Sequence, residues 1–185
     1  MPGKRVRILC EDRNTERFLR RLCDRFDVEV LRVALQPAGE GAASAWVRRQ
    51  YVDNVVWLRS RSYQQGLGLL VGIDGDNRGR LRRLRELEDA LRSAEQPPRS
   101  ASEPIAIFTP TWSIETWLAR LCGHPNVRED SSIKFDATHR HLWEKGSATK
   151  PTLRAAVDAW GIDAEAVASL SSAYEEASRL ARLVS

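Results

Sequence analysis

The sequence lacks any apolar run near the roughly 18 residues that a membrane-spanning helix requires, so we expect no membrane partner. Its first residues, MPGKRVRILCED, reach acidic side chains directly after a short apolar run, which argues against a secretory signal. The three cysteines, Cys10, Cys23 and Cys122, are odd in number and form no CxxC pair. They argue against a disulfide framework and favour a reducing, cytoplasmic location.

A P-loop is also missing: no GxxxxGK[ST] occurs, so we do not expect P-loop ATP hydrolysis by this chain. Lysine is scarce, and most of the 29 basic residues are arginine, with a formal net charge of +4. Arginine favours bidentate contacts with phosphate, so a polyanionic partner such as nucleic acid is physically reasonable. A GC-rich genome explains an arginine bias equally simply.

The 185 residues are enough for one ordinary domain, and an apolar fraction of 42% can form a hydrophobic core. Short apolar runs alternate with segments of helical periodicity, which predicts an α/β fold with a largely parallel, Rossmann-like sheet of about four strands. We expect residues 1–122 to form this core, and residues 123–185 to add an irregular segment and C-terminal helices packed on it. Asn14 is the expected N-cap of the first helix. The expected strands are 6–10, 28–35, 68–74 and 105–108, and the expected helices are 14–26, 42–64, 78–94, 113–122, 151–160 and 163–184.

Acidic residues follow three of these strands. Glu11 comes directly after the first strand, and Asp74 and Asp76 come after the third. Glu115 opens the helix after the fourth. Because functional groups in open parallel sheets gather beyond the carboxyl ends of the strands, we expect these side chains to meet at one edge. Neighbouring carboxylates repel one another, and Mg²⁺ or Mn²⁺, which prefer oxygen ligands, would offset that repulsion.

Three motifs occur in order: LCEDRNTERFL, GIDGDN and TPTWSIETWL. Together they resemble the Toprim family, especially the stand-alone and OLD-type Toprim nucleases of bacterial defence and repair. In that family a glutamate follows the first strand in a V-E-G-x-T-E context, D-x-D follows the third, and I-E-x-W follows a proline-containing strand end. Asp12 departs from the pattern, since the family usually has glycine there. Over residues 5–122, the matching residues are Glu11, Thr15, Glu16, Asp74, Asp76, Ile114, Glu115 and Trp117.

The resemblance implies a Toprim-like fold and a nuclease that depends on Mg²⁺ or Mn²⁺. It implies that Glu11, Asp74 and Asp76 hold the metal at the scissile phosphate. Glu115 would help to hold a second ion, and Glu11 is alternatively a general base toward the attacking water. OLD-type domains are often fused to or encoded with a P-loop ATPase, so a separate ATPase partner is expected by analogy. A homodimer is compatible with the same resemblance.

Basic residues near these acids are candidates for substrate contacts. Lys145 is a candidate catalytic lysine, with Lys150 as its rival, because related nucleases often use a lysine near the metals. Arg13, Arg78 and Arg80 are candidates for binding the nucleic-acid backbone. The arginines of residues 78–85 have an alternative explanation as a solvated helix face with acidic partners.

Other interpretations stay open. Glu115 also lies in a first helical turn, where the helix dipole favours acids. A regulatory or toxin-like subunit could keep the fold and cleave nothing alone. A haloacid-dehalogenase-type phosphatase also uses D-x-D, but there the pair follows the first strand and a threonine stands where this chain has Arg78. The histidines near residues 124–141 lack zinc-site spacing.

Overall fold

The computed structural model describes residues 3–38, 42–76, 78–144, 149–160 and 167–184. Four strands form one sheet in the order β2-β1-β3-β4, and every pairing is parallel. This confirms the predicted α/β class and the Rossmann-like sheet. The strands are β1 (Arg5–Cys10), β2 (Glu29–Leu35), β3 (Leu67–Gly72) and β4 (Ile105–Phe108).

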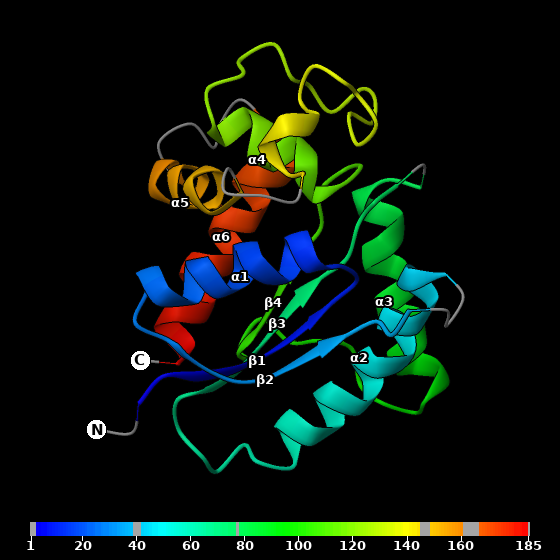
Figure 1. Cartoon of the computed structure of the whole chain (residues 1–185). Coiled ribbons are helices and arrows are strands. Elements are labelled where there is room, and N and C mark those ends of the chain that lie inside the picture. Colours follow the sequence, from blue (N-terminus) through cyan, green and yellow to red (C-terminus); the bar gives the residue numbers. More distant parts are fainter. Residues whose placement is uncertain (1–2, 39–41, 77, 145–148, 161–166, 185) are drawn as a thin grey trace.

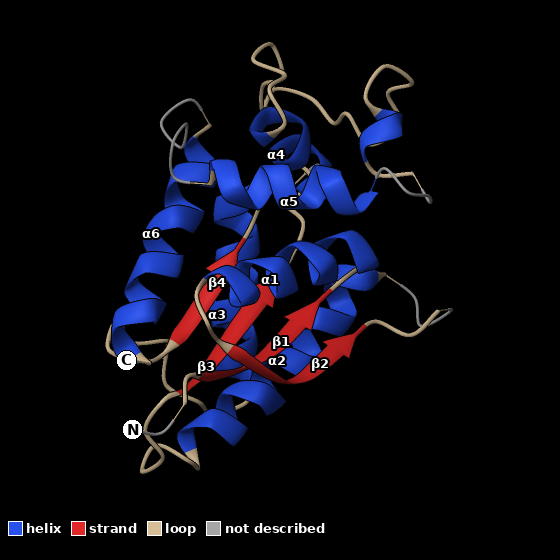
Figure 2. Ribbon diagram, turned by 60° about the vertical axis from the view of Figure 1, so that its left-hand side comes forward, coloured by secondary structure: helices blue, strands red, loops and turns tan. Residues whose placement is uncertain are grey.

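Helices cover both faces of the sheet (Figures 1 and 2). On one face, side chains of β1 and β4 pack with α1 (Arg13–Arg25), α4 (Ile114–Leu121), α5 (Thr149–Ala159) and α6 (Ala168–Leu183). On the other, β3 packs with α2 (Ala43–Arg59) and α3 (Arg80–Ser93). Two hydrophobic cores result, and β3 is buried along its whole length, as its apolar sequence predicts.

The first helix begins earlier than expected. Asp12 is its N-cap, because its Oδ1 accepts a hydrogen bond of 2.8 Å from the backbone N–H of Thr15. The prediction that Asn14 caps this helix is therefore wrong. Asn14 lies inside the first turn, and its side-chain amide reaches across to the carboxylate of Glu115.

The helix α2 ends at Arg59, where the expected helix continued to residue 64. Residues 60–66 form turns that lead into β3. From Gly123 to Glu144 the chain is irregular, as expected, apart from a short 3₁₀ helix (Arg140–Leu142). No helix of the described residues has the length and apolarity to cross a membrane.

The C-terminal helices join the core through aromatic packing. The rings of Phe18 and Trp160 have centroids 5.2 Å apart, and those of Trp117 and Trp160 are 6.0 Å apart. Along β4, the carboxylate of Glu176 in α6 accepts a hydrogen bond from the backbone N–H of Ile107. Arg179 of the same helix donates to the backbone carbonyl of Ile105. Side chains of α6 thus satisfy backbone groups along the outer edge of β4.

The loops after β3 and β4 run side by side. The N–H of Gly75 donates to the carbonyl of Pro110 at 3.0 Å, and the N–H of Asp76 donates to the carbonyl of Trp112 at 2.8 Å. A Cβ atom on Gly75 would lie 2.1 Å from the carbonyl oxygen of Thr111, so only glycine allows this approach. The pairing fixes where Asp74 and Asp76 stand.

We expect Gly75→Ala to lower the free energy of unfolding by about 2–3 kcal/mol, because one of two hydrogen-bonded backbones must move. Urea unfolding would measure the change. Gly3→Ala is the matched control, since nothing lies within 4 Å of a Cβ at Gly3. Equal stability of the two variants would contradict the tight pairing of the loops.

Candidate functional site

Glu11, Asp74 and Glu115 meet at the carboxyl end of the sheet, as the sequence predicts. Glu11 follows β1, Asp74 follows β3 after Ile73, and Glu115 lies in the first turn of α4. Their residues are 9%, 2% and 1% exposed. The backbone of Asp74 also hydrogen-bonds the carboxylate of Glu11, so the residue that follows β1 contacts the backbone that follows β3.

The carboxyl of Glu11 is held in an environment that disfavours its charge. Burial, and then the nearby carboxylate of Asp76, raise its pKa to about 7, against an opposing effect of Arg83. Its Oε1 atom is buried and has no hydrogen-bond partner among the described residues. An acid with a pKa near neutrality and a free oxygen can exchange a proton with a bound water or ligand.

The carboxyl of Asp74 is also held in an environment that disfavours its charge. Burial raises its pKa well above the ordinary value, and the carboxylates of Asp12, Glu11 and Glu115 raise it further. Lys134 opposes this shift. An acid in such a position is destabilising for the fold when ionised, so it is a candidate for function rather than for structure.

Glu115 is buried with one bonded and one free oxygen. Its Oε1 accepts a hydrogen bond of 3.0 Å from the side-chain amide of Asn14. Its Oε2 has no partner among the described residues. Ser113, not Glu115, occupies the N-cap position of α4. The first-turn position of Glu115 therefore does not account for its burial, because an acid serving the helix dipole alone gains nothing from leaving water.

Asp76 differs from the other three acids because its side chain is half exposed. The guanidinium of Arg83 donates to Asp76 Oδ2 at 2.9 Å, to the backbone carbonyl of Asp74 at 2.9 Å and to Glu86 at 2.8 Å. Arg83 is 3% exposed, so this one arginine fixes the loop after β3 and is not available to a substrate. The backbone of Asp76 has a positive φ of 49°, which the same bonds hold in place.

Lys134 is the site residue that sequence reasoning missed. Its Nζ lies 3.8 Å from Asp74 Oδ2 and 3.9 Å from Asp12 Oδ2. Burial alone would lower its pKa, but Glu115 and Asp74 raise it, so the ammonium is charged. The scarcity of lysine was the only hint in the sequence, because residues 123–139 have no periodicity that places them.

The other predicted basic residues have different surroundings. Arg13 is largely exposed and pairs with Glu16 at 2.7 Å, and Arg78 pairs with Glu86 at 3.2 Å. No hydrogen bond or ion pair joins Arg80 to another described residue. Lys145 lies outside the described residues, so its predicted catalytic role stays a prediction.

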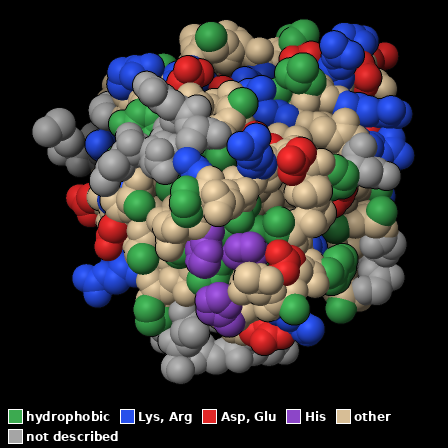
Figure 3. Space-filling view, turned by 90° about the horizontal axis from the view of Figure 1, so that it is seen from above, with side chains coloured by type: hydrophobic (Ala, Val, Ile, Leu, Met, Phe, Trp, Pro, Cys, Tyr) green, Lys and Arg blue, Asp and Glu red, His purple; other side chains and the backbone are tan. Residues whose placement is uncertain are grey.

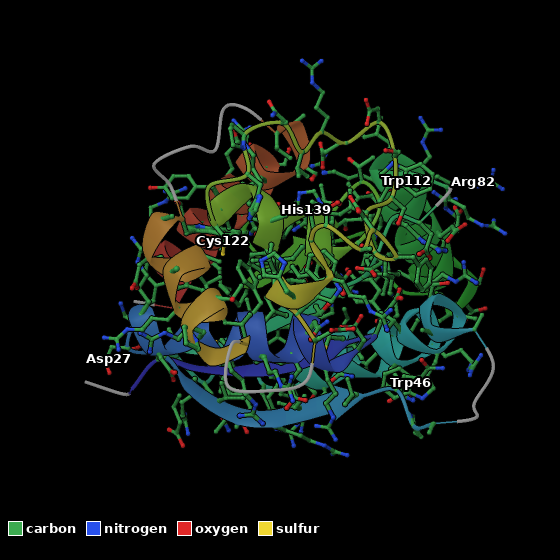
Figure 4. All side chains as sticks on the ribbon, turned by 45° about the horizontal axis from the view of Figure 1, so that its top comes forward. Asp27, Trp46, Arg82, Trp112, Cys122 and His139 are labelled. Carbon is green, nitrogen blue, oxygen red and sulfur yellow. The ribbon has the colours of Figure 1, made fainter. Side chains whose placement is uncertain are left out.

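Figure 4 shows Arg82 and Trp112 on the side of the molecule away from Asp27, which follows α1 at the opposite edge of the sheet.

Five carboxylates share this edge with two cations. The acids are Glu11, Asp12, Asp74, Asp76 and Glu115, and the cations are Arg83 and Lys134. Among the described residues, no three His, Cys, Asp or Glu side chains are grouped closely enough to hold a metal ion as they stand. The chemistry of the donor set nevertheless fits a hard divalent cation, since all donors are oxygens and Glu11 and Glu115 each keep one oxygen without a described partner.

The three histidines gather on the face seen in Figure 3. The rings of His124 and His139 have centroids 4.9 Å apart, and those of His124 and His141 are 6.4 Å apart. His124 and His139 line a cavity of about 430 Å³, and Nδ1 of His139 is 2.8 Å from Asp136. Among the described residues, no group of three metal-ligating side chains includes them.

No protein-family model, curated protein or solved structure matches this chain. The motifs and the site geometry are therefore the features that bear on the function of this protein.

We expect Glu11→Gln to raise the free energy of unfolding by about 1–3 kcal/mol near pH 8, with a smaller gain near pH 5. In the fold the pKa of Glu11 is about 7, against an ordinary value of 4.5. The contribution of the protonated carboxyl to stability is complete below the unfolded pKa and is lost as the pH rises through 7. The amide of glutamine stays neutral at both pH values, so the variant does not lose this stability as the pH rises.

Urea unfolding at the two pH values would measure the effect, with the exposed Glu88→Gln as the matched control. A Glu11→Gln protein that is less stable than the wild type near pH 8 would instead show that the ionised carboxylate supports the fold.

Proposed function

We propose that this chain is a divalent-metal-dependent nuclease that hydrolyses phosphodiester bonds, alone or as the nuclease subunit of a bacterial defence or repair system. The observation that carries the proposal is the meeting of Glu11, Asp74 and Glu115, which are almost fully buried and come from three strand ends. They stand in the order of the three motifs that resemble the Toprim family.

The free energy that is lost by burying these carboxylates together supports a functional role for them. Burial and mutual repulsion raise the pKa values of Glu11 and Asp74, so their ionised forms destabilise the fold at neutral pH. Apolar or amide side chains of similar size would remove this cost. Groups whose environment opposes their ordinary charge state are concentrated at catalytic sites.

The residues that would hold Mg²⁺ or Mn²⁺ are Glu11, Asp74, Asp76 and Glu115. When bound, the ion supplies Lewis-acid polarisation of the scissile phosphate and favours the ionised carboxylates. The carboxyl of Glu11, with a pKa about 7, is suited to accept a proton from the attacking water.

Lys134 is a further candidate for the catalytic lysine, beside Lys145, which the resemblance suggested. Its ammonium lies 3.8 Å from Asp74 and is fixed at the edge where a phosphate would meet the acids. A positive charge held in place before the reaction stabilises negative charge that develops on phosphate oxygens, and it does so more strongly in a partly buried site than in water.

Purified protein is expected to cut plasmid, single-stranded DNA or RNA when Mg²⁺ or Mn²⁺ is present, and Asp74→Asn is expected to abolish the cleavage. Asp89→Asn, at an exposed position on α3, is the matched control and should cut normally. Mn²⁺ should also raise the melting temperature of the wild type and not that of Asp74→Asn, because a ligand stabilises the state that binds it. Cleavage that survives in Asp74→Asn would refute the proposal.

Lys134→Met is expected to slow cleavage by about 100-fold, the usual effect of losing one charge-stabilising group. Lys4→Met, at the amino end of β1 on the opposite edge, is the control. Single-turnover cleavage measures the change. Equal rates for Lys134→Met and Lys4→Met would remove Lys134 from the reaction.

A second function is favoured by one observation. Asp12, which replaces the usual glycine, shares Lys134 with Asp74, so an internal cation partly neutralises the acids. A non-catalytic subunit of an ATPase-containing complex would keep such a cluster without cutting nucleic acid. Binding of Mn²⁺ without cleavage of any substrate would support this second function.

A further inference from the structure

A tight turn holds Lys134 in the site. The turn is closed by a hydrogen bond of 2.9 Å from the N–H of Asp136 to the carbonyl of Ile133. On one side, Ile133 is buried in the core at 9% exposure. On the other, the Asp136 carboxylate is bonded to the backbone N–H of Thr138 and to the ring of His139, both at 2.8 Å. Both ends of the turn are therefore anchored.

The two residues at the tip of this turn have opposite environments. Lys134 reaches inward to Asp74 and Asp12, whereas Phe135 is 90% exposed. An exposed apolar side chain needs no explanation by itself. Phe135 differs from the others because an anchored turn holds it one residue from an ammonium that contacts the acidic edge.

We propose that Phe135 is a stacking platform for an unpaired base, and that the strand entering the acidic site is single-stranded there. This inference rests on the proposed function, because it names the form of nucleic acid that the same site accepts. A phosphate beside Lys134 would bring the neighbouring base to the exposed ring. Only an unpaired base offers a free face, since duplex bases are stacked on one another.

Two exposed arginines follow Asp76 along the chain. Arg78 lies in the loop before α3 and Arg82 in the first turn of α3; their side chains are 47% and 64% exposed, and both pair with Glu86. In Figure 3, Lys and Arg side chains gather at the upper right of the view and also lie at its upper left and left margins. Positive charge along a backbone path, combined with an aromatic ring for the bases, is the usual arrangement in proteins that bind single strands.

The test measures binding without cleavage. A short oligonucleotide carrying 2-aminopurine is titrated with protein in Ca²⁺, as a single strand and as a duplex. We expect quenching of the single strand only, and about tenfold weaker single-strand binding for Phe135→Ala with duplex binding unchanged. Phe135→Trp should retain the affinity. The matched control is Tyr63→Ala, which removes a 76% exposed aromatic ring between α2 and β3, at the amino end of the sheet.

Several results would overturn the inference: no loss in Phe135→Ala, an equal loss for single strand and duplex, or an equal loss in Tyr63→Ala. The inference would also be overturned if Phe135→Ala lost binding to a partner protein while its oligonucleotide binding was unchanged. The ring would then belong to a protein interface. Failure of the nuclease proposal gives a different result. In that case the wild type cuts nothing in Mg²⁺ or Mn²⁺, while the Phe135-dependent quenching in Ca²⁺ remains.

Discussion

Mutual repulsion among buried carboxylates is the constraint on which the rest of the site depends. A parallel sheet directs β1 and β3 to the same edge, so the acids that follow them cannot avoid each other. Two cations make the arrangement compatible with folding. Arg83 holds the loop of Asp74 and Asp76 from the side of α3, and Lys134 approaches from the irregular segment after α4. Each comes from a different part of the chain, so the charge balance depends on the complete tertiary structure.

The positions of the acids were predictable because they follow from local rules. Apolar runs mark the strands, and the carboxyl ends of parallel strands meet, so Glu11, Asp74 and Glu115 could be placed together without coordinates. The N-cap of α1 could not be chosen in the same way. Asp12 and Asn14 are both good capping residues, and only the contact of Asn14 with Glu115 shows why Asp12 takes the position.

The cations could not be predicted, for two physical reasons. Arg82, Arg83 and Arg85 look alike in the sequence, and the rotation of about 100° per helical residue decides that only Arg83 turns into the protein. Lys134 stands in a segment without periodicity, and its partners Asp12 and Asp74 are distant from it in the sequence. The local sequence pattern does not predict contacts between such distant residues. The acidic residues of the site could therefore be predicted from the sequence, but Arg83 and Lys134 could not.

The two margins of the sheet are unequal. At β4, Glu176 and Arg179 of α6 occupy backbone groups that a further strand would need. At β2, the other outer strand, several side chains reach solvent. A further strand would therefore meet side chains of α6 at β4, whereas β2 is an outer strand with exposed side chains, so the two margins of the sheet differ in what they present to a further strand.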